Sequence, residues 1–552
     1  MAFVTRSAGE PHSSGGWMSP RGCVLAHRMA LFSRRLLWTY DLGVSELDEQ
    51  APLTSAVVRG AGLAGVGFAL TYAISLLSYI AFARLAPPAT FGTFAAASIL
   101  VSGATLFAES GMTAVVVQWR DRLEAVAATA CVSTLVGGIL LSLAALLLSP
   151  AVGALFRSHQ IGVVAAALSG LLFLHAAPVV PYALLQRRLS LRPRLIVEPS
   201  AVAVQGIVTG IALAAGLGVW ALVLGGYAWA TVRTVATWAL AGWRPRKSNV
   251  SWAMWRELAR YARHVVASEL LRESSGLGTT ALIGRVLGTA PLGQFRYASR
   301  MATTGASLTT IGAYVMFPAF ARIAADEERF RSAFTRSVRV AALAVFPVSF
   351  VFLVLGEPIA VLVFGDVWRQ AGHILMALSG ITAAAALISV AAEAVKAAGR
   401  PDILPRIHAL AGLLSIVLII AFLPLGAVGV GVALSIGSAS AAVYGLARAA
   451  AVAHVPLHQI WRELVPAAVA SAVVAALLAA LNLGIDVGGR SEVVRAGVLL
   501  SELLFGAALY TVVVARLSPK SAAEIVVIRR LLAPRLWRSA RTDVRTGQTP
   551  ES

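Results

Sequence analysis

The sequence predicts an all-α polytopic membrane protein with about 14 transmembrane helices. We expect two six-helix lobes, related by a pseudo-two-fold axis along the membrane normal, and two extra C-terminal helices. Three observations lead to this prediction: an apolar composition, a series of apolar segments separated by basic loops, and an internal repeat. Of the 552 residues, 58% are hydrophobic and only 13% are charged, about half the charged fraction of an ordinary soluble domain.

The apolar segments have the length that a membrane-spanning helix needs, about 20 residues. The closest neighbours are separated only by short turns, at Gly216–Gly218 and at Gly426. We predict helices at residues 60–83, 93–117, 124–148, 161–185, 195–215, 218–242, 264–284, 293–320, 340–364, 373–395, 407–424, 426–447, 464–483 and 496–515.

The internal repeat pairs residues 83–100 with residues 284–301, without a gap, at an offset of 201 residues. Six of the eighteen pairs are identical: Arg84/Arg285, Ala89/Ala290, Gly92/Gly293, Phe94/Phe295, Ala97/Ala298 and Ser98/Ser299. Six predicted helices separate the two copies. Because six is even, both halves have the same orientation, which predicts parallel repeats of the kind found in transporters.

The basic residues predict the orientation. With both termini in the cytoplasm, 36 of the 46 Lys and Arg residues lie in cytoplasmic segments and only 6 lie outside, which agrees with the positive-inside rule. The net charge of +20 is therefore distributed along membrane surfaces. It does not form a basic domain, and we expect no nucleic-acid partner.

These observations divide the chain into six parts. We expect a cytoplasmic N-terminal extension without ordered structure, an N-lobe of helices 1–6, a basic cytoplasmic inter-lobe loop, a C-lobe of helices 7–12, helices 13–14 and a basic cytoplasmic tail. Their ranges are 1–55, 56–242, 243–263, 264–447, 448–516 and 517–552.

Neither a metal site nor a cofactor is expected. The histidines near the predicted helices are scattered, whereas a metal site needs clustered ligands. Cys23 and Cys131 are far apart in the sequence, one in the polar N-terminal part and one in an apolar helix. They indicate no disulfide framework.

Several strings resemble the Wzx-type polysaccharide and O-antigen flippases, which belong to the multidrug/oligosaccharidyl-lipid/polysaccharide exporter superfamily. The resemblance covers roughly residues 55 to 520. The strings occur in the order ARLAPPATFGTFA, FAESGMTAVVVQ, LLQRRLSLRPR, GVWALVLG, LIGRVLGTAPLGQFRYASR, FPAFARIAADEERFRSAF and VKAAGRPD.

The resemblance implies a two-lobe fold with alternating access. It also implies translocation of undecaprenyl-pyrophosphate-linked oligosaccharide to the outer leaflet of the bacterial cytoplasmic membrane, for exopolysaccharide, O-antigen or capsule synthesis. The expected partners are this lipid-linked substrate, the phospholipid bilayer, and the polysaccharide polymerase and export machinery. Relatives often carry Asp before the IGR string, where this chain has Thr279.

Arg296 and Arg300 are the main candidates for substrate binding. They lie at i and i+4 on one face of a predicted helix, without an acid nearby in that helix. Two like charges at this spacing repel each other, so we expect an anionic partner such as the substrate diphosphate. The alternative is that they reach the membrane interface or pair with another helix.

Other intramembrane charges are weaker candidates. Glu269, Arg272 and Glu273 lie within one turn and pair with one another, unless they contact substrate or helix 1. Arg233 has no acid close to it in the sequence and is assigned to the cationic cavity with Arg272. Glu109 is a candidate coupling-ion site, with a hydrogen bond between packed helices as the simpler interpretation.

Three alternative functions follow from the same observations. A membrane glycosyltransferase is disfavoured, because the first outer loop, residues 84–92, contains no carboxylate. A cation-coupled multidrug exporter needs a carboxylate-lined cavity, whereas the unpaired charges here are mainly arginines. A peptidoglycan lipid-precursor flippase remains compatible with the charge pattern. We therefore predict a transporter and not an enzyme, with no catalytic residues.

Overall fold

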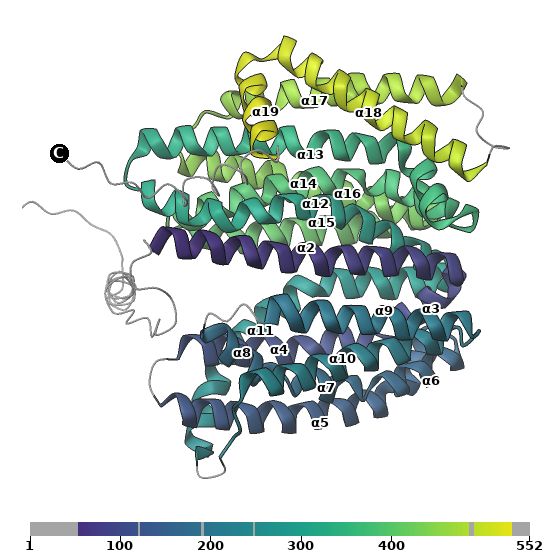
Figure 1. Ribbon diagram of the computed structural model, residues 1–552, viewed down its shortest axis with the longest axis vertical. Coiled ribbons are helices and arrows are strands. Elements are labelled where there is room, and N and C mark those ends of the chain that lie inside the picture. The colour runs from purple at the N-terminus through teal and green to yellow at the C-terminus, as the bar shows by residue number, and fades with distance from the viewer. Residues whose placement is uncertain (1–52, 120–121, 189–192, 247–248, 485–490, 533–552) are drawn as a thin grey trace, which may run out of the picture. The chain divides into compact units, whose positions relative to one another are not determined.

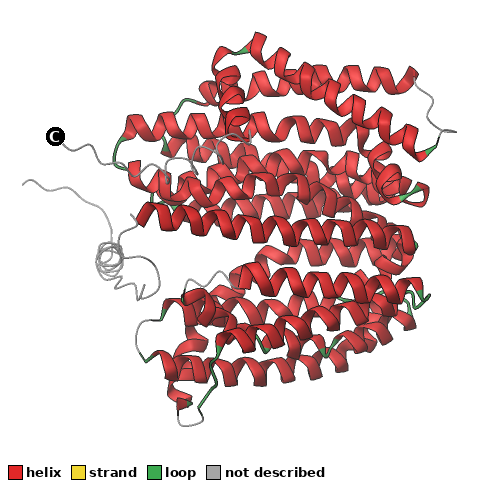
Figure 2. Ribbon diagram, viewed as in Figure 1, coloured by secondary structure: helices red, strands yellow, loops and turns green. Residues whose placement is uncertain are grey.

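The computed structural model describes residues 53–119, 122–188, 193–246, 249–484 and 491–532. In these ranges all regular elements are helices and there is no strand (Figure 2). Contacts divide the chain into two units, residues 1–62 and 63–552. The first unit is described only over residues 53–62, which are helical, so most of the predicted N-terminal extension (1–55) lies outside the described residues.

The predicted all-α membrane fold is confirmed. Ten segments of the described residues are long and apolar enough to cross a membrane, and one of them, 401–452, contains two helices. Large apolar side chains such as Leu77 and Leu147 are exposed on these helices, as expected for surfaces that contact lipid. The number of 14 spans stays a prediction.

The first half of the chain contains two predicted spans that are interrupted helices. The second breaks at Ser98, and the fourth breaks near Gly170 and Pro178. Gly216 and Gly218 have positive φ, which glycine adopts without strain, and they form the predicted turn. The elements are α2 (Leu53–Leu85), α3 (Pro88–Ala97), α4 (Ile99–Gln118), α5 (Leu123–Leu155), α6 (His159–Leu168), α7 (Leu171–Ala176), α8 (Val179–Arg187), η1 (Pro193–Val197), α9 (Glu198–Ala214) and α10 (Val219–Ala241).

The second half is built from longer helices, and two helices near its C-terminal end, α17 and α18, lie beside α13 (Figure 1). The elements are α11 (Trp252–Leu282), η3 (Ile283–Leu287), α12 (Thr289–Ile323), α13 (Glu327–Phe364), η4 (Asp366–Trp368), α14 (Arg369–Ala397), η5 (Pro401–Ile403), α15 (Leu404–Phe422), η6 (Leu423–Leu425), α16 (Gly426–Val452), α17 (Leu457–Gly484), α18 (Glu492–Leu517) and α19 (Pro519–Leu532).

The range 243–263, expected to be a loop, is helical from Trp252 onward. Ser251 caps this helix through its side chain, which accepts a hydrogen bond from the Met254 amide at 3.5 Å. The Trp255 indole donates to Ser133 Oγ of α5 at 3.1 Å. The segment expected to be a basic loop thus forms the first turns of α11, which are capped by Ser251 and held against α5 by Trp255.

The tail expected at 517–552 also begins with a helix. In α19, Glu524 accepts two hydrogen bonds from Arg336 of α13, at 2.8 and 3.0 Å. This bidentate pair holds α19 against the polar first part of α13. Residues 533–552 lie outside the described part of the chain.

Within residues 63–552, most helices pack against helices of the same half of the sequence, with two important exceptions. Helices α5 to α10 pack among themselves, and so do α13 to α16. Between the halves, α3 packs against α12, and α11 packs against α4 and α5. The seventh predicted helix, expected in the C-lobe, thus lies against helices of the first half.

Candidate functional site: a cavity between the two halves

The two copies of the sequence repeat contact each other directly. A Cβ atom built on Gly92 would lie 1.7 Å from the Thr289 carbonyl oxygen, and one on Gly293 would lie 1.9 Å from the Pro88 carbonyl oxygen. Thr289 is itself the repeat partner of Pro88. The contact is therefore two-fold symmetric, and only glycine allows the two backbones to approach this closely.

Aromatic side chains surround this contact. Tyr297 is completely buried, and its ring centroid lies 4.1 Å from those of Tyr79 and Trp368 and 4.9 Å from that of Phe91. The Trp368 indole donates to the Ala83 carbonyl oxygen at 2.9 Å. We call this region, formed by residues 83–92, 289–297 and 364–368, the closed end, because packed side chains fill it.

Beside the closed end lies a cavity of about 510 Å³. Helices α2, α9 and α12, the repeat segment around α3, and Leu222 of α10 form its wall. Serine, threonine and glutamine side chains line it together with aromatic rings. Among its described lining residues, the only ionisable side chains besides the Tyr79 phenol are those of Arg296 and Arg300.

Both arginines are exposed to this cavity from one face of α12. Arg300 lies over the Tyr72 ring, with Cζ 5.9 Å from the ring centroid. Neither arginine forms an ion pair with a described residue. Two guanidinium groups without a counter-charge among the described side chains create a positive potential in a low-dielectric wall, which suits an anionic group.

The two copies of the repeat line the cavity with different chemistry. Ala95 and Ser98 line it from the first copy, and their repeat partners, Arg296 and Ser299, line it from the second. The backbone contacts of the repeat are symmetric, whereas the cationic charge lies on the second copy only. The second copy therefore gives the cavity a basic wall, whereas the wall from the first copy is uncharged.

Comparison with known proteins identifies the family. Residues 81–373 match the model of the family described as polysaccharide biosynthesis protein. This match covers more than half of the chain. The chain belongs to this family.

Two curated relatives agree with this family. The succinoglycan biosynthesis transport protein ExoT of Rhizobium meliloti is 23% identical over 323 residues, 58% of this chain and 65% of that protein. The lipopolysaccharide biosynthesis protein WzxC of Escherichia coli is 24% identical over 338 residues, 59% of this chain and 67% of that protein. The chain thus spans about two thirds of the length of each.

Solved structures agree with the fold. A lipid II flippase, MurJ, in an inward closed conformation has a TM-score of 0.67 at 13% identity, covering 85% of this chain and 100% of the other. An inward-facing multidrug resistance transporter of the MATE family has a TM-score of 0.55 at 15% identity, covering 69% and 95%. At these identities the likeness concerns the fold alone.

In this family member, Arg233 is not part of the cavity lining, which corrects the prediction. Its Nε atom lies 3.5 Å from Glu198 Oε1, and both side chains are mostly buried, at 15% and 25% exposed. Its guanidinium group also lies over the rings of Tyr182 and Trp229, at 5.3 and 5.1 Å. Glu198 is 35 residues away in the sequence, so spacing along one helix does not reveal this pair.

The side chains of three other candidates, Glu109, Glu269 and Arg272, lie outside the described residues. Their predicted roles stay predictions. Glu273 is partly buried on α11 and does not line the cavity. Thr279, where relatives often carry Asp, is buried, and its hydroxyl donates to the Ser275 carbonyl oxygen at 2.8 Å.

Most of the neutral polar residues of the cavity were not predicted from the sequence. Ser75 and Ser78 of α2 and Gln205 and Thr209 of α9 line it. The pairs Ser75/Ser78 and Gln205/Thr209 are spaced three and four residues apart on otherwise apolar helices. This helical spacing of polar side chains is the signal that would have revealed a polar stripe on each helix.

Arg233 is expected to act in stability. Arg233→Ala leaves the largely buried Glu198 carboxylate without this partner and should lower the free energy of unfolding by roughly 3 kcal/mol. The double variant Arg233→Met/Glu198→Gln should recover most of this loss, because no charge is left unpaired. Thermal unfolding of purified protein in detergent measures both effects.

The exposed pair Arg329–Asp326 of α13 provides the control. Arg329→Ala should change the free energy of unfolding by less than about 0.5 kcal/mol. Equal losses for Arg329→Ala and Arg233→Ala would contradict a special role for the Arg233 pair.

Proposed function

We propose that this protein is a flippase, which moves an undecaprenyl-pyrophosphate-linked oligosaccharide across the bacterial cytoplasmic membrane. The pair Arg296 and Arg300, facing a cavity between the two halves, carries this proposal. The glycan repeat unit is destined for an exopolysaccharide, O-antigen or capsule. The names of the relatives, a succinoglycan transport protein and a lipopolysaccharide biosynthesis protein, support this substrate class.

The cavity walls suit the parts of such a substrate. A diphosphate accepts bidentate hydrogen bonds from the guanidinium groups of Arg296 and Arg300. The hydroxyl and amide groups of Ser75, Ser78 and Gln205 provide donors and acceptors for sugar hydroxyls, and Phe91 and Phe94 offer apolar surface to sugar rings. The polyprenyl chain stays in the lipid, because its transfer into this polar cavity would be unfavourable.

The proposed transport cycle is alternating access. The Lys and Arg distribution supports an orientation with the closed end at the outer side of the membrane and both termini in the cytoplasm. The headgroup enters the cavity from the cytoplasmic side while the repeat contact keeps the outer side shut. The two halves then rock about this contact, and the headgroup leaves outward. The polymerase and export machinery act on the released unit.

Two other classes of substrate are the alternatives to this one. A peptidoglycan lipid precursor carries the same diphosphate, and the fold is similar to that of a lipid II flippase. A lipophilic drug cation is disfavoured, because the described cavity lining has two arginines and no carboxylate.

Purified protein in proteoliposomes tests the substrate. Undecaprenyl-pyrophosphate oligosaccharide, lipid II and a lipophilic cation are supplied in separate samples. Translocation is followed by the access of an impermeant sugar-oxidising or sugar-binding reagent to the two glycolipids, and by efflux of the cation. We expect protein-dependent translocation of the oligosaccharide lipid and none of the cation. Translocation of lipid II alone, or of the cation, would overturn the proposal.

A further inference from the structure

A second site lies away from the cationic cavity, at the closed-end side of helices α13, α17 and α18. It is a slot of about 160 Å³. Its polar lining residues are Glu357, Arg369, Asn482, Arg495 and Glu502. It shares no lining residue with the cavity that contains Arg296 and Arg300.

Glu502 is the unusual residue of this slot. Glu502 lies in the interior of α18 and is only 6% exposed, and its Oε1 atom has no hydrogen-bond partner among the residues that the structure describes. The polar side chain that faces it from α17 is Asn482. A buried carboxylate with an unsatisfied oxygen is energetically costly, whereas the neutral acid is not. An ionisable group at such a depth in a membrane protein usually serves a function.

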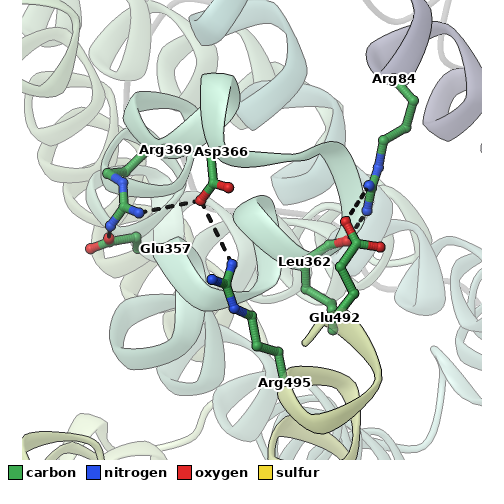
Figure 3. A network of polar contacts seen from close by, with 7 residues as sticks. All are labelled: Arg84, Glu357, Leu362, Asp366, Arg369, Glu492 and Arg495. Carbon is green, nitrogen blue, oxygen red and sulfur yellow. Dashed lines mark hydrogen bonds and ion pairs between the residues drawn. The ribbon is translucent and has the colours of Figure 1, made fainter. Parts of the chain in front are cut away.

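The charged groups around the slot already have partners. Arg369 pairs with Glu357 at 2.5 Å and with Asp366 at 3.4 Å, and Arg495 lies 3.7 Å from Asp366 (Figure 3). His373 of α14 lies 2.9 Å from the second oxygen of Glu357. Glu502 is therefore outside this set of ion pairs, and it lies two helical turns from Arg495 on the same face of α18.

The first turn of α18 is also connected to the closed end. Glu492 accepts a hydrogen bond at 2.8 Å from Arg84 at the end of α2, and Arg84 also donates to the Leu362 carbonyl oxygen of α13 (Figure 3). A further hydrogen bond from Arg84 goes to the Val363 carbonyl oxygen. A movement of α18 would thus alter contacts with both halves of the protein at the closed end, through Arg84 of α2 and through α13.

We propose that Glu502 is a proton-binding site that controls how α18 is held against the closed end. When Glu502 has taken up a proton from water, its side chain is neutral and Arg495 remains paired with Asp366. Loss of that proton leaves a carboxylate that attracts Arg495 along the slot, away from Asp366. Arg369 and Arg495 repel metal cations, which leaves the proton as the ion that the slot accepts.

Infrared spectroscopy of the purified full-length protein tests the site without a transport assay. We expect a carbonyl band of a buried carboxylic acid at neutral pH, which converts to a carboxylate band at alkaline pH. Glu502→Gln should abolish this band, and Glu502→Asp should retain it at a shifted position. Glu492→Gln, which removes an exposed carboxylate from the same helix, should leave it unchanged. A spectrum of Glu502→Gln identical to that of the wild type would overturn the proposal.

The movement of α18 is tested by pulsed electron paramagnetic resonance. Spin labels are attached at the exposed positions of Leu500→Cys and Val367→Cys, after Cys23→Ala and Cys131→Ala. We expect the distance between the labels to change when the pH is raised through the range in which the infrared band converts. Glu502→Gln should hold the distance at its neutral-pH value. The same pH-dependent change in Glu502→Gln would contradict the proposed switch.

Discussion

Arg300→Ala is expected to lower the rate of substrate translocation about 10- to 100-fold at normal membrane levels. A hydrogen bond to a charged group contributes about 1.5–3 kcal/mol, and each 1.4 kcal/mol corresponds to about a factor of ten. Arg296→Ala should have an effect of the same size, because both guanidinium groups face the same cavity from one side of α12. Arg300→Lys should retain part of the activity, since it keeps the charge and loses the bidentate geometry.

The same helix provides a matched control. Arg322 lies in the last turn of α12, exposed and outside the cavity lining. Arg322→Ala should therefore transport normally in the proteoliposome assay. Full activity of Arg300→Ala would remove the basis for assigning the anionic headgroup to this cavity.

Gly293→Ala is expected to disrupt the closed end. The added Cβ would meet the Pro88 backbone, so α3 and α12 must separate. We expect a loss of about 1–3 kcal/mol in the free energy of unfolding, and more if the backbone cannot move. Gly92→Ala should act similarly. The double variant should cost less than the sum, because both substitutions break one contact.

Thermal unfolding measures the stability, and cysteine labelling measures the opening. Ala95 lines the cavity next to the repeat contact. In a background without native cysteines, a thiol introduced by Ala95→Cys should react faster with an impermeant outside reagent when Gly293→Ala is present. Gly137→Ala and Gly412→Ala are the controls, because a Cβ at either position meets nothing within 4 Å. Equal labelling rates in all four proteins would contradict the role of the repeat contact as an outer barrier.

The two arginines of the cavity could be predicted from the sequence because the prediction needs only their spacing along one helix. Arg296 and Arg300 repel each other on one helix face and have no acid within reach along the helix. The structure places both at the cavity. The same reasoning failed for Arg233, because its partner Glu198 comes from the preceding helix. Sequence spacing reveals ion pairs within one helix, whereas ion pairs between helices depend on how the helices pack.

The fold, too, was predictable from the sequence in part. The apolar segments corresponded to helices, but the helical start of α11 at Trp252 and the interruptions at Ser98, Gly170 and Pro178 were not predicted. A hydropathy pattern measures transfer into lipid over a whole segment. It does not report the capping and local backbone contacts that begin or interrupt a helix.

The sequence by itself determined the membrane class, the duplication at the offset of 201 residues and the candidate status of Arg296 and Arg300. These properties follow from composition and from spacing along one helix. Only the tertiary structure decided that Gly92 and Gly293 meet, that Arg233 pairs with Glu198, and that Glu502 is buried in a slot of its own. The physical reason is that close packing and electrostatic pairing depend on distances in space, which residues far apart in the sequence acquire only when the helices assemble.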